Sequence, residues 1–146
     1  MNDPHDLERF VTAQDDGATY TQALEELRAG SKRSHWMWFV FPQIAGLGQS
    51  ATSRRYAIAS LDEARAYLRH PVLGRRLVEC AAAVDNVSNR GATEIFGGID
   101  ARKLQSSMTL FLRAAPEEQV LGRVLEHFFN GEADPATDRL LAGQGT

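Results

Sequence analysis

The feature that most constrains the fold is the helical spacing of apolar residues through most of the chain. Leu7, Phe10 and Val11 near the start are three and four residues apart, and Leu104 and Met108 repeat the pattern further on. This spacing gathers apolar side chains on one face of an α-helix. The sequence has no alternating apolar and polar stretch of useful strand length. We therefore predict an all-α fold.

Capping residues indicate where the helices begin and end. Ser60 and Glu63 form a capping box, Asp134-Pro135 and Asp100 are typical helix starts, and Gly30 is a typical helix end. These boundaries predict a compact bundle of six to eight helices. A chain of 146 residues is the size of one domain. We expect a single domain over residues 1–146, with a core of about 6–142 and short flexible ends.

One segment departs from the helical pattern. Trp36 to Phe41 is a continuous apolar run of six residues, which fits a buried strand or a buried helical turn, and Pro42 ends it in either case. Residues Gln43 to Ala59 then show no clear period. We predict one long loop after Pro42, and loops of that length in a compact domain are usually functional or mobile.

Composition excludes several classes of protein. The single cysteine, Cys80, cannot form an internal disulfide, which favours a reducing compartment. The sequence shows no apolar run of membrane-spanning length and no signal-peptide pattern, so we expect a cytoplasmic protein without a membrane partner. A formal net charge of −3 argues against a nucleic-acid partner.

Charge is distributed unevenly. From Leu27 to Leu61 the chain has no Asp or Glu, yet this stretch contains Lys32, Arg33 and His35. Such a stretch can form a local positive patch for an anionic partner. Lys32 and Arg33 are candidates to hold the anion, Trp36 or Trp38 to stack on the ligand, and His35 to transfer a proton near neutral pH.

Two further segments extend this candidate site. The loop offers backbone amides from Gly46 to Ser50, followed by Arg54, Arg55 and Tyr56. On a later helix, Lys103, Ser106 and Ser107 lie on one side. We predict that Lys32, His35, Lys103 and Ser107 converge on one cleft. The sequence has no metal-ligand spacing, dinucleotide fingerprint or phosphate loop, so we predict neither a metal nor a cofactor.

Four runs of sequence resemble a known family: DLERFVTAQ, ALEELRAGSKRSHWMWFVFPQIAGLGQS, EARAYLRHPVLGRRLVEC and IFGGIDARKLQSSMTLF. The family is the bacterial and fungal domain-of-unknown-function family 1810, and the resemblance covers about residues 6–142. Some members carry a calpastatin label, which does not fit because calpastatin repeats are disordered and this chain is not. The resemblance implies a helical single domain without an established activity. The chain departs from it at Gly98-Ile99-Asp100, where a Pro-Asp-Asp type turn is expected.

The resemblance also implies a set of polar positions. They are Lys32, His35, Gln43, Ser50, Tyr56, His70, Lys103, Ser106, Ser107 and Thr109.

Two functions from different classes remain open. The first is a small-molecule site, binding or hydrolytic, for an anionic, phosphorylated or nucleotide-like ligand in a polar cleft beside Trp36–Phe41. The alternative is a non-catalytic helical interaction module that uses the loop of residues 43–59.

Overall fold

The computed structural model describes residues 3–144, and its regular secondary structure in this range is helical. Seven of its helices have eight residues or more: α1 (Glu8–Asp15), α2 (Thr19–Ala29), α5 (Leu61–Arg69), α6 (Leu73–Asp85), α8 (Gly98–Ala114), α9 (Gln119–Phe129) and α10 (Pro135–Gln144). Three shorter ones are α3 (Met37–Val40), α4 (Ala51–Arg55) and α7 (Ala92–Phe96), and Asp16–Ala18 forms a 3₁₀ turn. The all-α prediction is confirmed, and the seven longer helices agree with the predicted six to eight.

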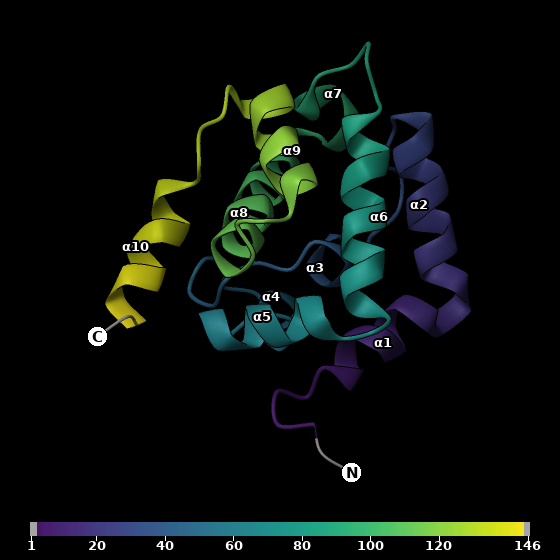
Figure 1. The fold of residues 1–146 in the computed structure, drawn as a ribbon. Coiled ribbons are helices and arrows are strands. Elements are labelled where there is room, and N and C mark those ends of the chain that lie inside the picture. The colour runs from purple at the N-terminus through teal and green to yellow at the C-terminus, as the bar shows by residue number, and fades with distance from the viewer. Residues whose placement is uncertain (1–2, 145–146) are drawn as a thin grey trace.

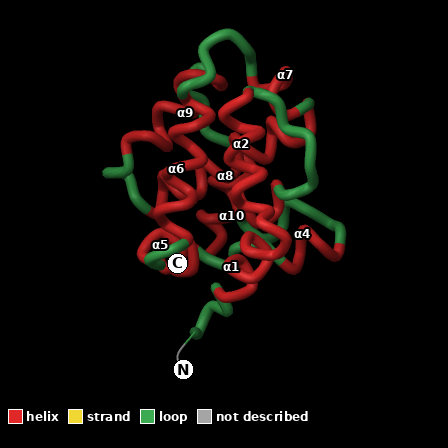
Figure 2. Tube along the Cα trace, turned by 90° about the vertical axis from the view of Figure 1, so that its right-hand side faces the viewer, coloured by secondary structure: helices red, strands yellow, loops and turns green. Residues whose placement is uncertain are grey.

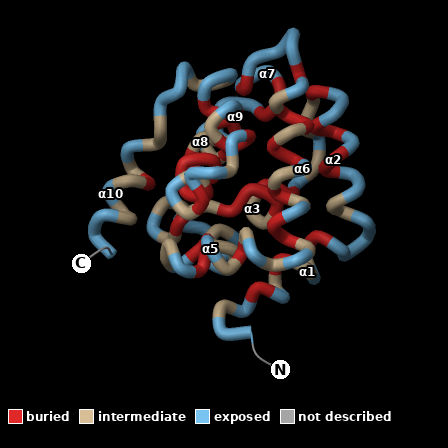
Figure 3. Tube along the Cα trace, viewed as in Figure 1, coloured by how far each residue is buried: buried red, intermediate tan, exposed pale blue. Residues whose placement is uncertain are grey.

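Helix α8 lies at the centre of the arrangement and packs against α5, α7, α9 and α10 (Figure 1). Helix α6 contacts α2, α5 and α9, so that these two helices connect most of the others. Loops and turns run around the outside (Figure 2). Buried residues concentrate where α3, α6 and α8 face the interior (Figure 3).

The capping box at the start of α5 forms only half as expected. Ser60 Oγ accepts a hydrogen bond from the Glu63 amide at 3.1 Å. The Glu63 carboxylate accepts from the Ala59 amide instead of the Ser60 amide, and it also forms an ion pair with Arg9 at 2.9 Å. Glu63 therefore ties the start of α5 to α1 as well as capping its own helix.

The apolar run after α2 lies mostly in the core, although Arg33 and His35 before it are exposed. Gly30 ends α2 with a left-handed φ of 72°, as predicted. Trp36 to Phe41 is a helical turn, α3, and not a strand. Met37, Val40 and Phe41 are buried in the core. A single turn suffices because the segment is anchored by side-chain packing and not by helix length.

The predicted long loop is more ordered than its composition suggests. Ser50 Oγ accepts a hydrogen bond from the Ser53 amide at 3.0 Å and begins α4 inside the loop. The two ends of the loop are joined by two backbone hydrogen bonds of 2.8 Å, from Ile58 N to Gln43 O and from Ala45 N to Ile58 O. The sequence predicted a loop here because α4 has only five residues and buries none of them, so it produces no helical period.

Asp100 does not cap α8, because the helix begins two residues earlier at Gly98 and Asp100 lies in its first turn. The flexible ends were expected outside residues 6–142; residues 1–2 and 145–146 lie outside the described residues. Among the helices of residues 3–144, none has the length and apolar character needed to cross a membrane.

Candidate functional site

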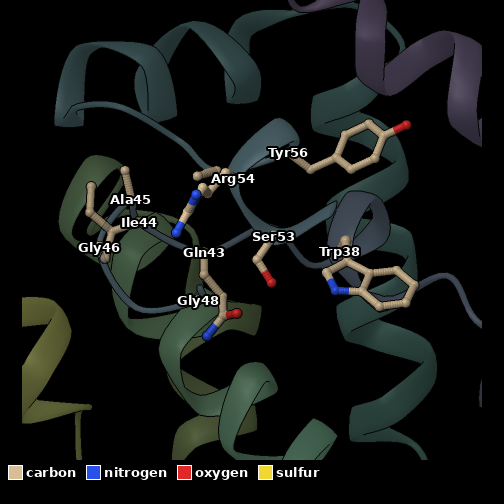
Figure 4. Close-up of a pocket in the computed structure, with 10 residues that line it drawn as sticks. Trp38, Gln43, Ile44, Ala45, Gly46, Gly48, Ser53, Arg54 and Tyr56 are labelled. Carbon is tan, nitrogen blue, oxygen red and sulfur yellow. The ribbon is translucent and has the colours of Figure 1, made fainter. Parts of the chain in front are cut away.

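A pocket with a volume of about 120 Å³ lies between α3, the start of the loop and α4 (Figure 4). We call it the Trp38 pocket. Its polar wall carries Trp38, Gln43, Ser53, Arg54 and Tyr56. Its remaining lining residues are small or apolar: Ile44, Ala45, Gly46, Gly48 and Ala57. The pocket exists because the paired ends of the loop bring Gln43 and Ala57 together beneath α4.

Hydrogen-bond donors dominate this wall. In Figure 4 the Ser53 hydroxyl, the Gln43 amide and the indole nitrogen of Trp38 point toward the same space. Ser53 Oγ accepts from Ser50 Oγ at 2.9 Å, so its own hydrogen is available to donate. The lining contains no carboxylate and one cation, Arg54. Within residues 3–144 Arg54 takes part in none of the ion pairs.

Two glycines shape the pocket. A Cβ atom on Gly48 would lie 2.4 Å from Ser53 Cβ, so only glycine allows α4 to approach the loop this closely. Gly46 has a φ of 106°, which L-residues rarely adopt, and Leu140 of α10 packs against it. The glycines therefore serve close backbone packing.

Trp36 and Trp38 have different environments. Trp36 is 0% exposed, and its Nε1 donates a hydrogen bond to Glu26 Oε1 at 2.9 Å, so a ligand has no free face to stack on. Trp38 is half-buried and lines the pocket. Of the two tryptophans offered as stacking surfaces, Trp38 is the one that a ligand can reach.

Glu26 is a polar centre that the sequence reasoning missed. Burial raises the pKa of Glu26, but hydrogen bonds from Arg33, Ser34 and Trp36 outweigh this effect and lower the pKa to about 2. The Arg33 and Ser34 amides lie 2.8 and 3.0 Å from Oε1. The Glu26 carboxylate thus holds the basic segment around Lys32 and Arg33 in place by binding the backbone amides of that segment. One signal was available, since Glu26 lies three residues after the apolar Ala23 and therefore shares its helix face.

Lys32 and Lys103 meet at one carboxylate. Lys32 Nζ lies 2.9 Å from Asp100 Oδ2, and Lys103 Nζ lies 3.6 Å from Asp100 Oδ1. Each ammonium also sits over an indole, Lys32 at 5.1 Å from the Trp36 ring centroid and Lys103 at 5.2 Å from that of Trp38. The chain has only these two lysines and two tryptophans. They come together from segments about 70 residues apart.

The structure distributes the other candidate residues over several places. His35 and Arg33 are exposed, and neither lines the Trp38 pocket. Gln43 and Tyr56 line it, and Ser50 supports it through Ser53. His70 Nδ1 accepts from the Val72 and Leu73 amides at the start of α6.

The hydroxyl residues of α8 lie apart from the pocket lining. Ser106 Oγ donates to Asp134 at 2.8 Å, and Thr109 Oγ1 accepts from the Asp134 amide at 2.9 Å, so both anchor the start of α10. Ser107 is fully buried, and its hydroxyl has no hydrogen-bond partner within residues 3–144. Lys32 and Lys103 are thus brought together by Asp100, while the side chains of His35 and Ser107 form no hydrogen bond or ion pair with that group in the described part of the chain.

Ser53 and Asp134 were also absent from the sequence-based site. Ser53 stands between two other polar residues, and only the fold shows that it faces the pocket. Asp134 was predicted to begin a helix, which it does: its carboxylate accepts from the Thr137 amide at 3.2 Å. Its additional bond to Ser106 depends on the packing of α10 against α8. In the part of the chain that the structure describes, no three His, Cys, Asp or Glu side chains gather as metal ligands.

The comparisons with known proteins agree with the family resemblance. The family profile described as "Protein of unknown function (DUF1810)" matches residues 4–141. The chain is similar to the crystal structure of the conserved hypothetical protein Rv1873 from Mycobacterium tuberculosis, with a TM-score of 0.93 and 53% sequence identity over 96% of this chain and 99% of that one. No curated protein matches the chain. Because the profile spans nearly the whole sequence, the chain belongs to the DUF1810 family.

Proposed function

We propose that the Trp38 pocket binds the oxyanion group of a small molecule. The observation that carries the proposal is the set of donors on its wall: the Arg54 guanidinium, the Ser53 hydroxyl, the Gln43 amide and the Trp38 indole N–H, with no carboxylate among the lining residues. An oxyanion accepts hydrogen bonds on every face, and bonds from a charged donor are about twice as strong as neutral ones.

The size of the pocket limits what it can enclose. Pockets for drug-sized ligands measure roughly 300–1,000 Å³, whereas this one measures about 120 Å³. It therefore accommodates a phosphate, sulfate or carboxylate group, and not a whole nucleotide. A sugar phosphate, a nucleotide or ADP-ribose would place its anionic group inside and leave the remainder at the mouth.

We propose binding, and not hydrolysis, as the function of this pocket. Proton transfer requires a group such as His, Asp, Glu, Lys, Cys or Tyr within reach of the ligand. Of these the ten lining residues include only Tyr56, and its hydroxyl points away from the Ser53, Gln43 and Trp38 donors in Figure 4. Proton transfer by His35 stays a prediction. Testing it requires a ligand large enough to extend beyond the pocket.

The direct test is a titration with sodium sulfate and with sodium phosphate. Calorimetry measures the binding, and the melting temperature is measured as a second readout. We expect saturable binding at constant ionic strength. Arg54→Met should weaken it by at least tenfold, since an ionic hydrogen bond contributes roughly 1.5–3 kcal/mol. Arg75→Met, an exposed arginine on α6 outside the pocket lining, should bind like the wild type. Equal affinity in wild type and Arg54→Met would exclude the pocket as the binding site.

A screen of nucleotides, sugar phosphates and ADP-ribose then identifies the larger ligand. The alternative function, an interaction module, predicts no saturable binding of any of these. The one large apolar side chain that stands exposed within residues 3–144 is Ile99, at the start of α8 and outside the loop of residues 43–59. The loop therefore shows no apolar docking surface of its own to favour the alternative.

A further inference from the structure

Lys103 places a second positive charge near the Trp38 pocket without lining it. Its ammonium lies over the Trp38 ring, 5.2 Å from the centroid, and its side chain is 22% exposed. Trp38 is the residue that the pocket and the lysine share. Any effect of Lys103 on the pocket therefore passes through Trp38 or through space across it.

Asp100 does not cancel this charge. Its carboxylate is bound more closely by Lys32, at 2.9 Å, than by Lys103, at 3.6 Å. The Lys32 side chain is only 8% exposed and is held further by the Ser34 carbonyl and the Trp36 ring. Asp100 is thus engaged mainly with Lys32, which leaves Lys103 with partial compensation.

Arg54 on the pocket wall and Lys103 behind Trp38 therefore both act on the contents of the pocket, and Arg55 adds a third cation over the ring of Tyr56, 5.5 Å from its centroid. A cation over an indole ring withdraws electron density from it, which makes the indole N–H a stronger donor toward an anion. The lysine charge also acts directly, because Coulomb interactions at the partly buried surface extend over several ångströms. Both effects increase with the charge of the ligand.

We infer that Lys103 makes the Trp38 pocket selective for a dianionic oxyanion, such as sulfate or a phosphate monoester, over a monoanionic one. This inference rests on the proposed function of the pocket. Lys103 acts as a positioning and specificity residue and does not touch the ligand. The Lys32–Asp100 ion pair holds Lys103 over Trp38 and joins α8 to the segment before α3.

The test compares sulfate with methanesulfonate, which has the same shape and one negative charge less. In the wild type, sulfate should bind about tenfold more tightly at constant ionic strength, since one additional charge at this range contributes on the order of one decade in affinity. Lys103→Met removes the charge and keeps most of the chain length, so its preference should fall to within about threefold. Lys103→Arg keeps the charge and should keep the preference.

A second readout follows the two indole N–H resonances of the protein by nuclear magnetic resonance. Trp38→Phe assigns them, because one of the two signals disappears. In Lys103→Met the Trp38 resonance should move while that of Trp36, bound to Glu26, stays in place. Unchanged positions of both signals would mean that Lys103 does not polarise Trp38.

The outcomes separate the two proposals. If neither anion binds the wild type, the proposed function is wrong and the selectivity is wrong with it. If both anions bind the wild type equally, or if Lys103→Met keeps the full preference for sulfate, the pocket binds oxyanions but Lys103 does not determine their charge. A preference that disappears in Lys103→Met and survives in Lys103→Arg supports the inference.

Discussion

Trp36 Nε1 donates a 2.9 Å hydrogen bond to Oε1 of Glu26, and both residues are buried. The bond joins the last turns of α2 to the turn before α3, and the Glu26 carboxylate also accepts from the Arg33 and Ser34 amides. A buried carboxylate is costly unless it is fully hydrogen-bonded. This one is satisfied by the segment that carries the basic residues, so the position of that segment depends on the charge of Glu26.

The first prediction follows from that charge. Because the pKa of Glu26 is lowered from 4.5 to about 2 by its hydrogen bonds, which outweigh the effect of burial, the ionised form stabilises the fold. This stability is present above pH 4.5 and is lost as the pH falls toward 2. Glu26→Gln should cost about 3 kcal/mol at neutral pH and remove that part of the acid dependence. Urea unfolding between pH 2 and 7 measures it, and the exposed Glu25→Gln serves as the control.

The second prediction separates the two tryptophans. Trp36→Phe removes a donor to Glu26 and leaves space in the core, so it should destabilise the protein by roughly 2–4 kcal/mol. Trp38→Phe should cost less than about 1 kcal/mol because Trp38 is half-buried, yet it should weaken sulfate binding. Calorimetry and urea unfolding of both variants provide the comparison. A larger loss of stability in Trp38→Phe than in Trp36→Phe would contradict it.

The third prediction concerns the close contact in the pocket wall. Gly48→Ala would place a Cβ atom 2.4 Å from Ser53 Cβ, so α4 must move away. Overpacking of this kind costs roughly 1–3 kcal/mol, and sulfate affinity should fall with the displacement of Ser53. Gly122→Ala on α9 has open space around its Cβ atom and should be neutral or stabilising. Melting temperatures and sulfate titrations of the two variants test this contrast.

The fourth prediction addresses the attachment of α10. Asp134 accepts from Ser106 Oγ at 2.8 Å and from the Thr137 amide at 3.2 Å. Asp134→Ala removes the cap and the acceptor of the buried Thr137 hydroxyl, while Ser106 Oγ keeps the Arg102 carbonyl at 3.1 Å as an acceptor. The substitution should cost roughly 1–3 kcal/mol. In Asp134→Ala, the backbone amides of α10 should exchange hydrogen faster than in the wild type, whereas those of α6 should be less affected. Asp138→Asn, which breaks an exposed ion pair with Arg113, should cost less than about 1 kcal/mol.

The fifth prediction concerns His35, which is exposed and does not line the Trp38 pocket. His35→Gln should leave both the melting temperature and the sulfate affinity unchanged. Once a turnover is identified, its loss in this variant with an intact melting temperature would mark His35 as the proton-transfer residue. A lower melting temperature in His35→Gln would instead show a structural contact for this side chain.

Local sequence was sufficient where local interactions decide the structure. Ser60 begins α5 and Gly30 ends α2 as predicted, because a cap forms between residues a few positions apart. Helical spacing likewise predicted the all-α fold. The short helix α4 escaped prediction because five residues without a buried face leave no period to detect.

The candidate site was harder to predict, because it depends on contacts between distant segments. Asp100 had the residue type of a helix cap, yet packing of α8 against the segment before α3 makes it the partner of Lys32 and Lys103. Ser106 and Thr109 are residue types that often bind ligands, but Asp134 at the start of α10 forms hydrogen bonds with both of their hydroxyls.

The sequence by itself determined the seven longer helices, the acid-free stretch from Leu27 to Leu61 and the membership of a family. These properties depend on residue order and on neighbours within a turn or two of helix. Only the tertiary structure decided that Trp36 is buried against Glu26 while Trp38 faces a pocket beneath Arg54. The two tryptophans are two residues apart, so the direction of each side chain follows from how α3 packs against α1 and α6 and from the hydrogen bond of Trp36 to Glu26 of α2, which no local pattern encodes.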